Sequence, residues 1–146
     1  MVKNKRRLFL VLMMLSIVFG LSNITIEEVD ASEKIRNIKE KQWERMVDAI
    51  CHVESRGDDN ARSRRSSAAG RFQMLRIYVD EVNRISGKKI YSYNDRFNPI
   101  KAREMFDIYQ GYYNPEKDID KAIILHRGKK SWRYIREVKN EMSKRN

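Results

Sequence analysis

The sequence is poor in residues that bind metals or form disulfides. Its 146 residues include one cysteine, Cys51, and two histidines, His52 and His126. A single cysteine cannot form a disulfide within the chain, and these three residues are a poor ligand set for zinc. His52-Val53-Glu54 matches half of a zinc deaminase signature, but the required Pro-Cys-x-x-Cys segment does not follow. No glycine-rich phosphate loop is present either, so we expect no metal and no cofactor.

The chain also has few residues that break helices. It contains two prolines and six glycines, while 41% of its residues are hydrophobic and 35% are charged. This composition excludes collagen-like and disordered chains and favours a compact, helix-rich fold. The length suits one domain better than two, so any catalytic site must be built within one core. We expect a small, monomeric, all-α domain.

The only long apolar run lies near the N-terminus, at residues 8–21. It follows a cluster of basic residues and is shorter than the ~20 apolar residues that a membrane span needs. Ala31 offers a small residue at which a signal peptidase could cut. We therefore predict that residues 1–31 are a signal peptide and that residues 32–146 form the exported domain, in the periplasm or at the cell surface. An uncleaved anchor through residues 8–21 is the alternative, because the segment before Ala31 is long and acidic.

Acidic residues are fewer than basic ones. The chain has 31 Lys and Arg against 20 Asp and Glu, which gives a formal net charge of +11. Such a charge favours a polyanion, which could be nucleic acid, anionic lipid or a bacterial cell wall that carries carboxylates and phosphates. Export favours the wall. The aromatic residues do not alternate with the basic ones as a base-stacking surface requires, so nucleic acid is not expected as a partner. A cationic surface that serves only solubility is the alternative.

The first helix of the domain is predicted over about residues 39–56. Apolar residues recur there at spacings of three and four, and Gly57 follows as a stop signal. The residues expected on the buried face are Trp43, Met46, Val47, Ile50 and Val53. Glu54 projects from the same side, because it follows Ile50 by four positions.

Four further helices are predicted after a polar loop over residues 58–70. The first covers about residues 71–86 with Leu75 on its inner face, and Gly87 ends it. The second opens at Asn98-Pro99, a cap followed by proline, and ends near Gly111. The third covers residues 118–127, before Gly128. The fourth is capped by Ser131 and buries Trp132.

Glu54 is the main candidate for chemistry. On an apolar face it loses hydration, and in the last turn of a helix it faces the negative end of the dipole, so both effects disfavour its charged form. A general acid must hold a proton in this way near neutral pH. A structural carboxylate paired with Arg56 fits the helical position equally well. Asp58 and Asp59 lie in the loop, where capping or solvated roles are expected.

The residues around Glu54 match a known pattern. The segment "VESRGDDNARSRRSSAAGRFQM" resembles the core of the soluble lytic transglycosylases and goose-type lysozymes, and "DRFNPIKAREMFDIY" is similar to the segment that flanks their cleft. The resemblance implies a lysozyme-like fold and action on the glycan strands of peptidoglycan. The matching positions are Glu54, Ser55, Gly57, Asn60, Ala61, Ser67, Gly70, Gln73 and Met74.

The resemblance also implies roles for individual residues. Glu54 would be the catalytic acid and base, with Ser55 supporting it. Gln73 would bind substrate, and Gly70 would leave room for the sugar chain against the backbone, with a simple turn before a helix as the alternative for Gly70. Where the family has A-Y-N-x-G, this chain has "ILHRG", so His126 replaces a tyrosine that approaches the glutamate. His126 would bond Glu54 or substrate, or else be a surface histidine near a helix end.

The reaction implied is cleavage of the MurNAc-GlcNAc bond with 1,6-anhydro ends as products. The alternatives are a hydrolytic, lysozyme-type muramidase and a non-catalytic wall-binding or secretion-apparatus protein that keeps the fold. Peptidoglycan strands are the expected partner, and a secretion or conjugation apparatus is a further candidate.

Overall fold

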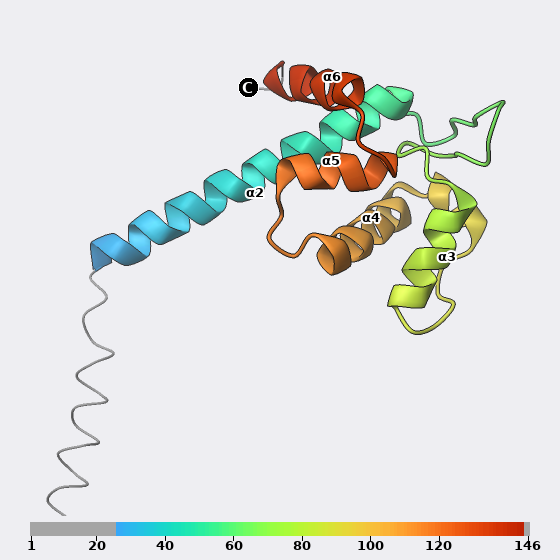
Figure 1. The fold of residues 1–146 in the computed structure, drawn as a ribbon. Helices are drawn as coiled ribbons and strands as arrows, with labels where there is room; N and C mark the ends of the chain where they lie inside the picture. Colours follow the sequence, from blue (N-terminus) through green and yellow to red (C-terminus); the bar gives the residue numbers. More distant parts are fainter. Residues whose placement is uncertain (1–25, 145–146) are drawn as a thin grey trace, which may run out of the picture. The chain divides into compact units, whose positions relative to one another are not determined.

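The computed structural model describes residues 26–144, and these are mostly helical. Within this range the only β-type pairing consists of isolated bridges, Arg62 with Ala69 and Ala69 with Met74. The predicted all-α class is thus confirmed. The elements are the α-helices α2 (Ile26–Ser55), α3 (Arg76–Ile85), α4 (Pro99–Tyr113), α5 (Ile119–Arg127) and α6 (Trp132–Ser143), with the 3-10 helix η1 (Tyr93–Phe97) before α4 (Figure 1).

The chain divides into two units, residues 1–40 and 41–146. The described part of the first unit is helical, and its side chains from Ala31 to Glu40 are exposed. Most of the predicted signal peptide and the candidate anchor at residues 8–21 lie outside the described residues, so both stay predictions. The expected cleavage point at Ala31 falls within α2. None of the described helices combines the length and the apolar character needed to cross a membrane.

The core of the second unit joins the last turns of α2 to the remaining helices. Trp43 of α2 lies against Phe106 of α4 with ring centroids 6.2 Å apart, and Phe72 stacks on Phe106 at 5.1 Å. Helix α4 also contacts α3, η1 and α5, while α5 contacts α6. Burying each such side chain stabilises the fold by about 1.5–3 kcal/mol. The predicted inner face of α2 is confirmed, because Trp43, Met46, Val47 and Ile50 are all buried.

Helix α2 ends one residue earlier than the glycine rule predicts. The left-handed residue that stops it is Arg56, with φ 58°, and Gly57 follows with φ 82°. The Arg56 amide donates to the His52 carbonyl at 2.8 Å, and the Gly57 amide donates to the Cys51 carbonyl at 3.2 Å. The first of these bonds, from the residue after the C-cap to the carbonyl four positions earlier, is that of an αL stop, with arginine where glycine is usual. By contrast, Gly87 and Gly128 end α3 and α5 as predicted, at φ 69° and 73°.

Helix α3 begins five residues later than predicted. Residues 71–74 form a turn in which the amides and carbonyls of Ala69 and Met74 bond each other at 3.1 Å. These groups are committed to the loop, so no helix can start until Arg76. Leu75 is 42% exposed instead of buried, and Tyr78 takes an inner position on α3.

The two other capped helices begin where the sequence indicated. The Asn98 side chain accepts from the amides of Ile100 at 3.0 Å and Lys101 at 3.1 Å, so it caps α4, which runs on past Gly111 to Tyr113. Ser131 caps α6 by accepting from the Tyr134 amide at 3.4 Å. Trp132 was expected inside but is 71% exposed, because α6 turns Tyr134 toward the core instead.

Candidate active site

A cleft of about 610 Å³ opens beside the end of α2. It is bounded by Glu54 of α2, by the loop through Ser63 and Ser66, and by the helices α3, α4 and α5. The side chains that matter for its chemistry are Glu54, Gln73, Tyr78, Glu81, Tyr109, Tyr113 and His126. This volume is in the range of pockets that hold small ligands.

Glu54 lies half-buried at the inner end of this cleft. Its side chain is 15% exposed, and the Tyr134 hydroxyl of α6 donates to its Oε1 atom at 2.6 Å. Burial raises the pKa of Tyr134, so this hydroxyl keeps its proton and remains a donor. Arg56, the alternative partner suggested by the sequence, is exposed and makes no ion pair with Glu54. The described contacts of this carboxylate therefore include a strong neutral donor.

His126 of α5 also approaches Glu54, as the motif comparison suggested. Its Nε2 atom is 3.8 Å from Glu54 Oε1, and its side chain is only 4% exposed. Burial lowers the pKa of His126, and the opposing influences of Glu54 and of the Phe72 backbone do not offset this effect. The imidazole is therefore neutral near pH 7, and the contact is not an ion pair there. Its Nδ1 atom has no hydrogen-bond partner among the described residues.

Ser55 and Gly70 support the site from behind instead of lining it. The Ser55 hydroxyl donates to the carbonyls of Arg71 at 2.9 Å and Cys51 at 3.2 Å, so it ties the end of α2 to the following loop. Gly70 has φ +73°, and a Cβ atom there would lie 1.8 Å from the Arg96 carbonyl oxygen. The backbone that requires glycine is therefore the protein's own. The alternative reading of Gly70 as a residue required by the fold is thus supported, and its role beside a sugar chain stays a prediction.

Gln73 does line the cleft. It adopts a left-handed conformation with φ 48°, and its Nε2 atom donates to the Gly70 carbonyl at 2.9 Å. The amide nitrogen is thus used within the loop, and the amide oxygen remains as the group that can accept from a ligand. The structure brings Glu54, Gln73 and His126 into one cleft.

The two loop carboxylates, Asp58 and Asp59, bond to groups of the loop itself. Asp58 accepts from the Asn60 amide at 2.8 Å, and Asp59 accepts two bonds from Arg71 at 2.5 and 3.0 Å. Both therefore have the capping or structural roles that the sequence suggested.

Glu81 is a second carboxylate of the cleft, and sequence reasoning missed it. Arg84 donates to both of its oxygens at 2.7 and 2.8 Å, and the Tyr113 hydroxyl donates as well. Arg84 first and Tyr113 second lower the pKa of Glu81 to about 2. The i,i+3 spacing of Glu81 and Arg84 was a signal for the pair, but not for its place in the cleft.

A wall of tyrosines faces the cleft opposite the loop. Tyr78 stacks on Tyr109 at 4.3 Å, and Tyr109 meets Tyr113 at 4.9 Å. The Tyr78 hydroxyl is buried and has no hydrogen-bond partner among the described residues. Unpartnered buried polar atoms are uncommon, so this hydroxyl and His126 Nδ1 are groups that a ligand in the cleft could satisfy.

The described residues contain no group of three His, Cys, Asp or Glu side chains arranged to hold a metal ion. Cys51 is buried next to the site, and burial raises the pKa of its thiol to about 12, so it is protonated.

Comparisons of the chain with protein-family models, with curated proteins and with solved structures found no match.

Proposed function

We propose that this protein is a peptidoglycan lytic transglycosylase with a lysozyme-like fold, exported to the periplasm or the cell surface, in which Glu54 is the single catalytic acid and base. The observation that carries the proposal is the setting of Glu54. It is half-buried in a cleft, bonded by the neutral Tyr134 hydroxyl at 2.6 Å and flanked by a neutral imidazole. A general acid must lie within hydrogen-bond reach of the group that it protonates, and this position puts the carboxyl group of Glu54 at the wall of the cleft.

Two further features support a sugar substrate. The stacked rings of Tyr78 and Tyr109 provide an apolar wall, and the Gln73 oxygen and the buried Tyr78 hydroxyl supply polar groups. Ligand sites commonly combine a mainly apolar lining with a few such polar groups. The family's tyrosine is absent at position 126, but Tyr134 brings a hydroxyl to the same carboxylate from α6.

The proposed reaction needs only one carboxyl group. Tyr134 occupies Oε1, so we assign the transferable proton to Oε2 of Glu54. This proton passes to the glycosidic oxygen as the bond from the MurNAc C1 atom breaks, and the GlcNAc end leaves as an alcohol. The acetamido oxygen of MurNAc stabilises the cation at C1. The 6-hydroxyl oxygen then bonds to C1 while Glu54 takes its proton, which closes the 1,6-anhydro ring and restores the acid.

Product analysis tests this chemistry. The full chain is incubated with purified sacculi, and the released muropeptides are treated with borohydride. Anhydro ends resist reduction, so unreduced products establish transglycosylation. Reducible ends would show that water is the attacker and that the protein is a hydrolytic muramidase. Binding to sacculi with no release would instead show a non-catalytic wall-binding protein, for example a part of a secretion or conjugation apparatus. A folded Glu54→Gln variant that releases nothing is the matched control.

A further inference from the structure

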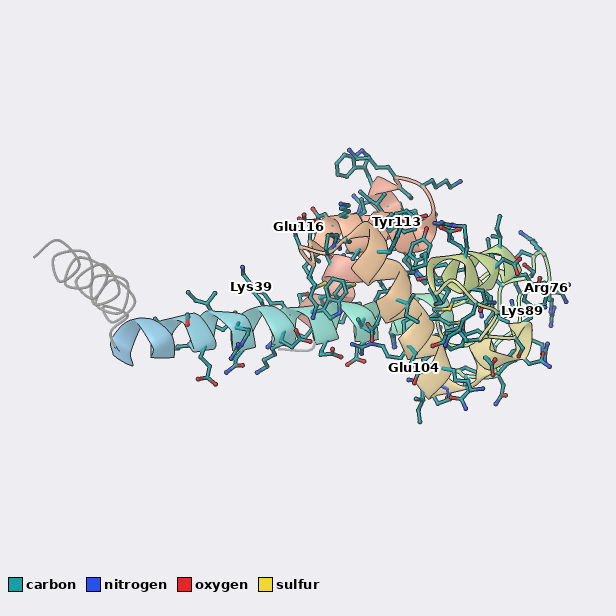
Figure 2. All side chains as sticks on the ribbon, turned by 90° about the horizontal axis from the view of Figure 1, so that it is seen from below. Lys39, Arg76, Lys89, Glu104, Tyr113 and Glu116 are labelled. Carbon is teal, nitrogen blue, oxygen red and sulfur yellow. The ribbon has the colours of Figure 1, made fainter. Side chains whose placement is uncertain are left out.

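Three arginines gather around η1 on the outer side of the loop that borders the cleft. Arg76 lies over the Tyr93 ring at 5.2 Å, and Arg62 lies over the Phe97 ring at 4.1 Å. Arg96 is within 6.0 Å of both ring centroids. We call Arg62, Arg76 and Arg96 the arginine cluster. Figure 2 shows Arg76 at the edge of the domain.

Within the described residues, no member of the cluster forms an ion pair with a carboxylate. Arg96 is 5% exposed, yet its hydrogen bonds go to backbone carbonyls: Nε donates to Tyr93 at 2.6 Å, and Nη1 donates to Met74 at 2.9 Å and to Ser67. Burial, followed by the positive charges of Arg76 and Arg62, lowers the pKa of Arg96. A buried cation without a counter-charge is costly, so this site is suited to receive an anion.

Two acidic residues lie near η1, but neither forms an ion pair with the arginine cluster. Asp80 accepts from the Tyr93 hydroxyl at 3.0 Å, and Asp95 accepts from the Lys101 ammonium at 2.6 Å. Other arginines of the described chain are paired directly with carboxylates, for example Arg71 with Asp59 and Arg103 with Glu44. The concentration of positive charge in the arginine cluster is therefore a local property, beyond the general charge of the protein.

The cluster continues toward the cleft through the loop. Arg64 and Arg65 are exposed there, while Ser63 and Ser66 of the same loop line the cleft. The Arg76 amide donates to the Ser67 hydroxyl at 3.2 Å, which holds this loop against the start of α3. A chain-like anion bound at the cluster could thus extend along the loop to the rim of the cleft.

We propose that the arginine cluster binds phosphate groups of an anionic polymer. Guanidinium groups donate two parallel hydrogen bonds to phosphate oxygens. The exposed Arg62 and Arg76 can do so, and the buried Arg96 adds positive charge behind them. A polymer is favoured over a single phosphate because Arg64 and Arg65 extend the positive surface. Nucleic acid is disfavoured because guanidinium groups already lie over the rings of Tyr93 and Phe97, where bases would stack. That the polymer belongs to the cell wall rests on the proposed function, but phosphate binding itself does not.

The test uses the full chain and long-chain inorganic polyphosphate, with binding measured by calorimetry at several salt concentrations. Arg62→Ala/Arg76→Ala removes two members of the cluster and leaves the buried Arg96 in place. Arg133→Ala/Arg136→Ala removes the same charge from the exposed face of α6 and is the matched control. We expect the cluster variant to bind at least about tenfold more weakly, with a slope of log K against log salt smaller by about two, and the control to stay close to the parent.

Four results would overturn the proposal. Equal losses in the two double variants, or equally tight binding of polyglutamate, would mean that net charge alone is responsible. Tighter binding of single-stranded DNA would indicate a nucleic-acid site, and binding of phosphatidylglycerol vesicles without polyphosphate would indicate a membrane surface. Glu54→Gln should bind polyphosphate like the parent, so failure of the phosphate site and failure of the catalytic proposal can be told apart.

Discussion

The cleft holds two carboxylates, Glu54 and Glu81, in opposite surroundings. Glu54 receives a bond from the neutral Tyr134 hydroxyl and lies 3.8 Å from a neutral imidazole. Glu81 receives two bonds from the Arg84 guanidinium, which lowers its pKa to about 2. Two carboxyl groups in one cleft can therefore have different roles, because Glu81 is held in an ion pair and Glu54 is not held by an arginine.

The difference arises from where each residue lies on its helix. Glu81 is inside α3, where a residue three positions later is its neighbour, and that residue is Arg84. Glu54 is the last residue but one of α2, so the chain turns away before an arginine can reach it. Arg56, two positions on, adopts the left-handed conformation and is exposed. Arg56 therefore does not pair with Glu54 as Arg84 pairs with Glu81.

The largest expected effect comes from replacing each of the two carboxylates by an amide, one at a time. Glu54→Gln keeps the size and a polar end but cannot deliver a proton, so muropeptide release should fall by about 10²- to 10⁴-fold. Glu81→Gln should retain activity within about tenfold, because its carboxylate is already ionised and paired. Release from purified sacculi measures both, and thermal unfolding checks that each variant is folded.

The opposite order of activities would contradict the roles assigned to the two carboxylates. If Glu81→Gln were the inactive variant and Glu54→Gln the active one, Glu54 would be structural and the proposed mechanism would fail. Loss of folding in Glu54→Gln would likewise mark it as a structural residue.

A smaller effect is expected from the hydroxyl that holds Glu54. Tyr134→Phe keeps the buried ring but removes the donor, and hydrogen bonds to charged groups are worth about 1.5–3 kcal/mol. As a positioning residue, Tyr134 should therefore affect kcat by about tenfold to a hundredfold, with little change in KM. Tyr78→Phe is the control for stability. Its hydroxyl has no partner among the described residues, so removing it should not lower the free energy of unfolding.

Equal losses of kcat in Tyr134→Phe and Tyr78→Phe would contradict the positioning role of the Tyr134 hydroxyl. A change in KM alone would place Tyr134 in substrate binding instead of carboxylate positioning.

The buried imidazole predicts a pH dependence of stability. The pKa of His126 is lowered in the folded chain from its ordinary value of 6.5, so below that value the unfolded chain binds a proton that the folded chain does not. The stabilisation is fully present above pH 6.5 and is lost as the pH falls, with a slope of up to about 1.4 kcal/mol per pH unit. Denaturant unfolding between pH 5 and 8 measures this slope.

His126→Phe should flatten the curve, because it fills the same aromatic surroundings without a titrating group. His52→Gln changes an exposed histidine on the same domain and serves as the control. The carboxylates of Glu44, Glu81 and Asp95 have lowered pKa values and titrate below this range. An unchanged slope in His126→Phe would show that the imidazole is not buried as described.

The sequence predicted the helices and one end of the site, because these depend on local patterns. The apolar spacing in α2, the Asn98 cap and the glycine stops at Gly87 and Gly128 are short-range signals, and the structure follows them. Position within α2 also indicated that Glu54 turns inward, and its side chain is 15% exposed.

The partners of Glu54 could not be found in the same way. Tyr134 lies 80 residues from Glu54 and meets it only because α6 presents Tyr134 instead of Trp132 to the core. Both residues fit an inward pattern at the start of α6, so periodicity does not choose between them. Gly70 was recognised as a necessary glycine, but its neighbour, the Arg96 carbonyl, lies 26 positions away and leaves no local signal.

The smallest expected effect concerns the residue that ends α2. Arg56 adopts φ 58°, a conformation that costs an ordinary residue about 1–2 kcal/mol, whereas glycine adopts it freely but loses more chain entropy on folding. Arg56→Gly should therefore raise the free energy of unfolding by about 1 kcal/mol or less. The control, Arg136→Gly, places glycine inside α6 and should lower it by about 1 kcal/mol. If the strained arginine also fixes the position of Glu54 at the helix end, Arg56→Gly will be more stable yet release muropeptides more slowly. If the backbone alone sets this geometry, the rate of muropeptide release will be unchanged. A lower free energy of unfolding in Arg56→Gly would show that the exposed Arg56 side chain stabilises the turn.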